Sequence, residues 1–172
     1  MQTFGINDDL VVDESVKVLR GGGLVMHPTE TCYGLAVDIF NEKALNKLYK
    51  VKGRDANKPV SILVDGIGMA MEYGVFSEKA LELAQKYWPG ALSLLVPRTK
   101  NLPEFLNPGE EFISIRHSSD TFSEDLPWKL GSPVTTTSAN LAGKDPLYEA
   151  DLSKLGDSST NIDLVVDGGV LS

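Results

Sequence analysis

The chain has 172 residues, and its 16 lysines and arginines against 24 aspartates and glutamates give a formal net charge of −8 at pH 7. This acidic balance argues against sequence-independent nucleic-acid binding, which needs a basic face, and the single cysteine excludes an intramolecular disulfide framework. No apolar run reaches the roughly 20 residues of a membrane span, and the N-terminus lacks a signal-peptide pattern. We therefore expect one cytoplasmic domain over residues 1–172.

Apolar periodicity, capping residues and turn residues predict alternating helices and strands. In chain order these are a helix at 13–19, a strand at 24–27, a helix between Asn41 and Gly53, a strand at 60–64, a helix at 78–87, and strands at 92–96, 112–116, 134–137 and 164–166. The expected helix N-caps are Asp13, Asn41 and Ser77. Strands separated by helices predict a layered sheet, but the pattern leaves parallel and antiparallel pairing open.

The segment Pro28–Leu35, PTETCYGL, follows a predicted strand, and ligands of layered α/β folds usually bind where strands end. It carries two hydroxyls, a carboxylate, a thiol and a phenol within five residues. Taken alone, it favours a turn in which threonine side chains bind the local backbone. A nucleophilic role for Cys32 would need a partner histidine, which the sequence does not indicate, so we expect this thiol to pack or to line a pocket.

Four cations fall within nine residues of this acidic chain, at Lys50, Lys52, Arg54 and Lys58. One interpretation is that they complement the dipole at the C-terminus of the predicted helix. The other is a clamp for phosphates or carboxylates, which the place of Arg54 after a glycine slightly favours.

Hydroxyl and amide groups gather in the segment 135–140, TTTSAN, where another predicted strand ends. They suit either a capping turn or a neutral cradle for phosphate oxygens and an amino acid. Arg116 ends the strand predicted at 112–116, a position at which arginine is usually exposed or paired with an acid. The sequence contains no P-loop (GxxxxGK followed by Ser or Thr), no dinucleotide-binding GxGxxG, no zinc-protease HExxH and no serine-hydrolase GxSxG motif.

Taken in order, PTETCYGL, KGR, KP, WPG, Arg116, TSAN and DGG resemble the YrdC-like threonylcarbamoyl-adenylate synthase family, over roughly Leu24 to Gly169. The resemblance implies an α+β fold of three layers, a twisted mixed β-sheet flanked by helices, with a large concave pocket. It also implies that L-threonine, bicarbonate and ATP with Mg²⁺ form threonylcarbamoyl-adenylate and pyrophosphate. Other proteins would use that product to modify tRNA next to the anticodon.

The resemblance implies site residues as well. It places Lys52, Arg54 and Lys58 beside the ATP phosphates, with Lys52 and Arg54 as catalytic cations that neutralise the departing pyrophosphate. It places Ser138 and Asn140 on the nucleotide side, and it implies no metal ligands from the protein. Around threonine it places Thr29, Thr31, Tyr33, Arg116 and Thr136.

The chain departs from the family pattern at two points. Leu63 stands where family members often carry a histidine near the threonine, and the sequence ends at Ser172, before a family strand whose Ser-Thr pair closes that site. We therefore expect weaker threonine binding than in a chain extended through that strand.

Two other functions are compatible with the sequence. One is a non-catalytic module of the same fold with weak RNA binding, which the charge of −8 disfavours. The other is a lyase acting on a pentulose phosphate, which would need an acidic metal-holding cluster, and none stands near Pro28–Thr31.

Overall fold

The computed structural model describes residues 1–53 and 58–171. The strands in this part of the chain are β1 (Gln2–Gly5), β2 (Val25–His27), β3 (Gly34–Ala36), β4 (Ser61–Leu63), β5 (Ser93–Pro97), β6 (Phe112–Arg116), β7 (Val134–Ser138) and β8 (Leu164–Asp167). The helical segments are α1 (Val11–Arg20), α2 (Glu42–Lys52), α3 (Ile67–Tyr73), α4 (Glu78–Tyr87), α5 (Thr121–Leu130) and the 3₁₀ segment η1 (Leu152–Asn161). None of these described helices is long and apolar enough to cross a lipid bilayer.

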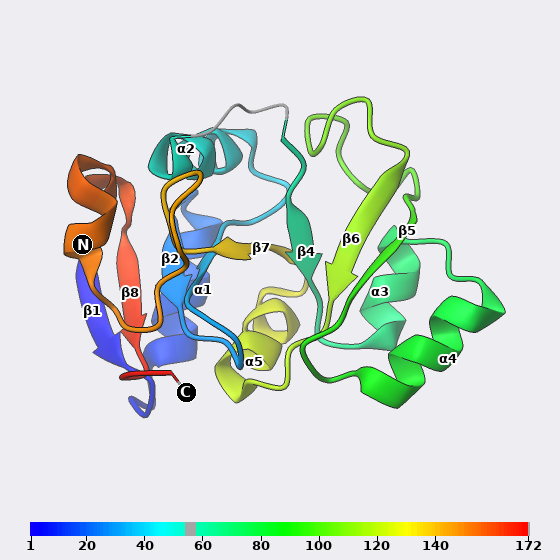
Figure 1. The fold of residues 1–172 in the computed structure, drawn as a ribbon, viewed down its shortest axis with the longest axis horizontal. Helices are drawn as coiled ribbons and strands as arrows, with labels where there is room; N and C mark the ends of the chain where they lie inside the picture. Colours follow the sequence, from blue (N-terminus) through cyan, green and yellow to red (C-terminus); the bar gives the residue numbers. More distant parts are fainter. Residues whose placement is uncertain (54–57, 172) are drawn as a thin grey trace.

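The strands form one mixed sheet in the order β1-β8-β2-β3-β7-β4-β6-β5 (Figure 1). β8 runs parallel to both β1 and β2, and β4 runs parallel to β6. The remaining neighbours are antiparallel. The pairing that the sequence left open is therefore of both kinds, and the α+β class with a mixed sheet is confirmed.

Helices cover both faces of the sheet because successive strand residues point to opposite sides. Val25 and Leu63 pack with α1 and α5, whereas Met26 and Ile62 belong to the other core cluster, which includes residues of α2, α3 and α4. In Figure 1, β7 lies between α2 above and α5 below. This is the expected three-layer arrangement.

Within residues 1–53 and 58–171, no helix covers one part of the sheet on the face that α1 and α5 cover elsewhere. Ile113 and Ile115 of β6 point into the core with α3 and α4. The alternate residues of β6 and β5 point the other way, and Leu95 and Phe112 remain 69% and 45% exposed. This alternation, predicted for 112–116, leaves the side chain of Arg116 on the uncovered face.

The helix boundaries follow the local capping signals in two of three cases. The Asn41 side chain accepts a hydrogen bond from the Ala44 N–H, and that of Ser77 accepts one from the Ala80 N–H, as predicted. The Asp13 cap is wrong, because α1 already begins at Val11. The Asp13 carboxylate instead pairs with Lys129 of α5, 2.7 Å away.

Five elements were not predicted from the sequence, namely β1, β3, α3, α5 and η1. β3 has only three residues, Gly34–Ala36, and α5 contains Pro127, which ordinarily argues against a helix interior. Both are held by packing on distant parts of the chain, since β3 pairs with β2 and β7 and α5 packs on the sheet beside α1.

Candidate active site

A cavity of about 330 Å³ opens beside the uncovered part of the sheet. That volume lies at the lower end of the range for ligand pockets, roughly 300–1,000 Å³. Its walls come from the segment after β2, the strands β3, β4 and β7, the start of β5 and the end of β6. The lining residues are Thr29, Thr31, Cys32, Gly34, Pro59, Val60, Ser61, Ser93, Arg116, Thr136, Thr137 and Ser138.

Thr29 organises the loop between β2 and β3. Its hydroxyl accepts hydrogen bonds from the N–H groups of Thr31 and Cys32, at 3.1 and 3.2 Å, and lies 2.7 Å from the Cys32 carbonyl oxygen, to which it donates. The segment is therefore a threonine-stabilised turn, as the residues alone suggested, and it is also a wall of the cavity.

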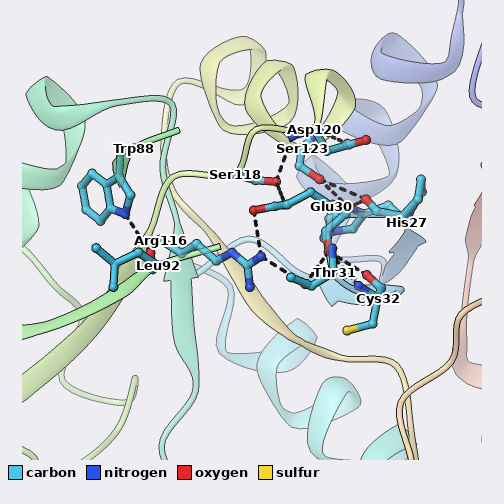
Figure 2. Close-up of polar contacts among 12 residues, drawn as sticks. His27, Glu30, Thr31, Cys32, Trp88, Leu92, Arg116, Ser118, Asp120 and Ser123 are labelled. Atoms are coloured by element: carbon cyan, nitrogen blue, oxygen red, sulfur yellow. Dashed lines mark hydrogen bonds and ion pairs between the residues drawn. The ribbon is translucent and has the colours of Figure 1, made fainter. Parts of the chain in front are cut away.

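Arg116 brings a positive charge into the cavity wall (Figure 2). Its Nη2 donates to Glu30 Oε1 at 2.8 Å and to the Thr31 hydroxyl at 3.0 Å. The second oxygen of Glu30 accepts a hydrogen bond from the Ser118 hydroxyl. Burial by itself would raise the pKa of the Glu30 carboxyl, but the hydrogen bonds from Ser118 and Arg116 together lower it below its ordinary value. Glu30 is therefore ionised at neutral pH.

The end of β7 meets the end of α2. The buried Lys52 donates to the Ser138 carbonyl oxygen at 2.5 Å and to Asn140 Oδ1 at 2.8 Å. The Ser138 hydroxyl also donates to Asn140 Oδ1, at 2.6 Å. Three residues predicted for the nucleotide side thus form one hydrogen-bonded group, of which Ser138 lines the cavity.

A second cavity of about 580 Å³ adjoins this group. The Asn140 side-chain amide donates to the carbonyl oxygens of Leu141 and Lys144, which both line it. The other lining residues are Asp145, Pro146, Leu147, Tyr148 and Lys154. Asn140 therefore lies between the two cavities.

Tyr33, which the resemblance implied next to threonine, makes its polar contacts with the chain after β8. The residue is fully buried and does not line the cavity. Its hydroxyl donates to the Gly169 carbonyl oxygen at 2.8 Å and accepts from the Gly168 N–H at 2.9 Å. In this structure Tyr33 ties the end of β8 to the loop that follows β2, a structural role that differs from the expected contact with threonine.

Lys58 and Arg54 are the other two cations that the resemblance places beside the ATP phosphates. Lys58 is exposed and directly precedes Pro59 and Val60 of the cavity wall. Arg54 lies outside the residues that the structure describes.

Within the part of the chain that the structure describes, Cys32 and Leu63 lack the neighbours or the position that a chemical role would need. Cys32 lines the cavity, but no histidine does among the described residues. Leu63, which stands at the family's histidine position, is fully buried against α1 and α5. Within the described residues, no group of three acidic, cysteine or histidine side chains is arranged to hold a metal ion.

Several cavity residues were not predicted from the sequence. Ser61 and Ser93 were not singled out, although each precedes a buried aliphatic residue of its strand, Ile62 or Leu94. That alternation was a usable signal that they face away from the core. Glu30 was noted only as a carboxylate in the turn, and no local pattern indicates that it meets Arg116, which is 86 residues away in sequence.

Comparison with known proteins assigns the family. The family model Sua5/YciO/YrdC, described as "Telomere recombination", matches residues 17–172. The chain belongs to the Sua5/YciO/YrdC family. It is 30% identical to a threonylcarbamoyl-AMP synthase from Pseudoalteromonas atlantica over 154 residues, which cover 87% of this chain and 80% of that protein. It is 33% identical to one from Thiobacillus denitrificans over 133 residues, which cover 77% and 71%.

A solved Sua5/YciO/YrdC structure confirms the fold. P. abyssi Sua5, complexed with L-threonine, matches 99% of this chain with a TM-score of 0.87 and 26% identity. The match covers 50% of the P. abyssi chain, so this chain spans about half the length of that Sua5 protein.

Proposed function

We propose that this chain is a threonylcarbamoyl-AMP synthase, an enzyme that joins L-threonine, bicarbonate and ATP and releases pyrophosphate. The observation that carries the proposal is the Arg116 guanidinium set in a cavity lined by hydroxyl groups. A zwitterionic amino acid needs a cation for its carboxylate and neutral oxygens for its ammonium group. The relatives named threonylcarbamoyl-AMP synthase and the Sua5 complex with L-threonine support the same function.

We assign threonine to the cavity of about 330 Å³. Its carboxylate would bind Arg116, and its hydroxyl and ammonium groups would bind the side chains of Thr31 and Thr136, which also line the cavity. Thr29 would act by shaping the turn, because its hydroxyl is already engaged with the backbone.

We assign the ATP phosphates to the group formed by Lys52, Ser138 and Asn140, with Arg54 and Lys58 as further cations. The adenosine end would then extend toward the cavity that adjoins Asn140. Mg²⁺ would arrive as part of the ATP substrate, since this ion commonly binds through substrate phosphates and water.

The proposed reaction needs no covalent bond to the protein. The threonine ammonium group first loses a proton to water, and the resulting amine attacks bicarbonate, so that water leaves and a carbamate forms. A carbamate oxygen then attacks the α-phosphorus of ATP, and the bond to the bridging oxygen breaks with its electron pair leaving on pyrophosphate. The residues contribute by placing the two substrates side by side and by stabilising negative charge. Lys52 and Arg54 would neutralise the pyrophosphate as it leaves.

The product would serve tRNA modification beside the anticodon, completed in the cytoplasm by partner proteins. The adenylate is a mixed anhydride, so its consumer must transfer the threonylcarbamoyl group and release AMP.

Pyrophosphate release tests the proposal directly. We expect release only when threonine, bicarbonate and ATP are all present, with threonylcarbamoyl-AMP formed in equal amount by mass spectrometry. Release that does not depend on threonine or bicarbonate would contradict the proposal. No release combined with binding to structured RNA would favour the non-catalytic RNA-binding module instead.

A further inference from the structure

Glu30 is held from both ends of its carboxylate. Oε1 accepts from Arg116 Nη2 at 2.8 Å, and Oε2 accepts from the Ser118 hydroxyl (Figure 2). The Glu30 and Arg116 side chains are only 18% and 17% exposed. Charged hydrogen bonds shielded from water in this way are strong and directional, unlike exposed ion pairs.

The far end of this chain of contacts is anchored to a helix. Ser118 is fully buried, and its hydroxyl also accepts from the Asp120 N–H at 3.2 Å. Asp120 in turn caps α5 by accepting from the Ser123 N–H at 2.9 Å. The position of Glu30 is therefore set by the start of α5 and not only by its own turn.

At the near end, one nitrogen of Arg116 carries all of the guanidinium's contacts. Nη2 donates to both Glu30 and Thr31, whereas Nη1 makes no hydrogen bond to any residue that the structure describes, and Nε is buried without a partner there. In Figure 2, Nη1 carries no dashed line. This arrangement fixes the plane of the guanidinium and keeps Nη1 available for an incoming acceptor.

Glu30 itself does not line the cavity, although its chain neighbours Thr29 and Thr31 and its partner Arg116 do. A ligand in the cavity therefore meets the guanidinium and not the carboxylate. A residue that acts on a ligand only through another side chain is a positioning residue.

We propose that Glu30 positions Arg116, by holding Nη2 so that Nη1 faces the carboxylate of the amino-acid substrate. This inference rests on the proposed function, which makes that carboxylate the ligand. Small displacements of a group that orients a substrate have large effects on binding and rate. Glu30 thus contributes to amino-acid binding without touching the amino acid.

Variants of Glu30 test this proposal because they should affect the threonine KM but not the ATP KM. For Glu30→Ala we expect the threonine KM to rise at least about tenfold while the ATP KM stays within about twofold. Glu30→Gln should stay within about threefold, because its amide oxygen still accepts from Arg116 and its NH₂ group donates to Ser118. The matched control is Glu82→Ala, which removes an exposed carboxylate paired with Lys79 on α4 and should change neither constant. A purely structural role would move both KM values together, or neither.

A double-mutant cycle decides whether Glu30 acts through Arg116. Added to Arg116→Ala, Glu30→Ala should raise the threonine Kd by less than about twofold further, as measured by calorimetry. If the effects of the two substitutions on the threonine Kd multiply, Glu30 contacts threonine itself and does not act through Arg116. If Glu30→Ala alone leaves the threonine Kd unchanged, Glu30 has no role in threonine binding. Either result overturns the proposal. If Glu30→Ala fails to fold, Ser118→Ala must raise the threonine Kd about threefold, and an unchanged Kd overturns the proposal.

Measuring Kd alongside turnover keeps the two proposals distinguishable. Wild-type protein that binds L-threonine but releases no pyrophosphate contradicts the proposed function, while the Kd ratios still support or refute the role of Glu30. Wild-type protein that does not bind L-threonine contradicts both.

Discussion

Replacing Tyr33 with phenylalanine removes one hydroxyl and keeps the ring that fills the core. The hydroxyl bridges the backbone of Gly168 and Gly169, at 2.9 and 2.8 Å. Burial raises the pKa of this phenol, so it remains protonated and able to donate at neutral pH. The substitution therefore removes two hydrogen bonds that hold the chain after β8 against the loop that follows β2.

The size of the effect follows from these two bonds. Gly169 is exposed and Gly168 is half-buried, so water can replace part of what is lost. At about 0.5–1 kcal/mol net for each bond, Tyr33→Phe should lower the free energy of unfolding by about 1–2 kcal/mol. For a chain of this size, this corresponds to a decrease in Tm of about 2–8 °C. The threonine KM should stay within about threefold, because Tyr33 does not line the cavity.

Urea unfolding and pyrophosphate release measure the two effects on the same preparation. Tyr87→Phe is the matched control, since Tyr87 is 50% exposed and its change should be within about 0.5 kcal/mol. Unchanged unfolding together with a threonine KM raised about tenfold or more would refute the reasoning. It would show that the Tyr33 hydroxyl acts in the site, as the family resemblance implied.

Three other substitutions address the cations, the thiol and the buried imidazole. Arg54→Ala should lower turnover with ATP at least about tenfold, or about 1.4 kcal/mol of transition-state stabilisation, with unchanged Tm; unaltered pyrophosphate release would mean that the basic cluster only stabilises the end of α2. Cys32→Ser should retain most activity, since the thiol only lines the cavity, and trapping of substrate on Cys32 in a mass spectrum would contradict this. Burial lowers the pKa of His27 below its ordinary value of 6.5. As the pH falls, the imidazole is therefore protonated in the unfolded chain before it is protonated in the folded one. The free energy of unfolding should then decrease below about pH 6.5, by at most about 1.4 kcal/mol per pH unit. Urea unfolding at about pH 7.5 and about pH 5.5 should show this decrease in the free energy of unfolding for the wild type and a smaller decrease for His27→Phe. Equal decreases in the two proteins would mean that other groups cause the pH dependence.

Local chemistry made parts of the structure predictable from sequence. Asn41 and Ser77 cap their helices, and Gly53 ends α2 with a φ of 56°, because these signals involve only neighbouring residues. The alternation of 112–116 correctly separated Ile113 and Ile115 from Arg116, since strand residues alternate whatever their neighbours are.

The roles of the motif residues were decided only by tertiary structure. Sequence placed Tyr33 and Thr31 in one short motif, yet Tyr33 bonds to the chain beyond β8 while Thr31 faces the cavity. The pairing of Glu30 with Arg116 joins groups 86 residues apart. No local propensity carries such information, because the partners meet only when β2 and β6 are brought into one sheet. The sequence therefore determined the family, the main helices and which chemical groups are present, and the folded sheet determined which of them meet.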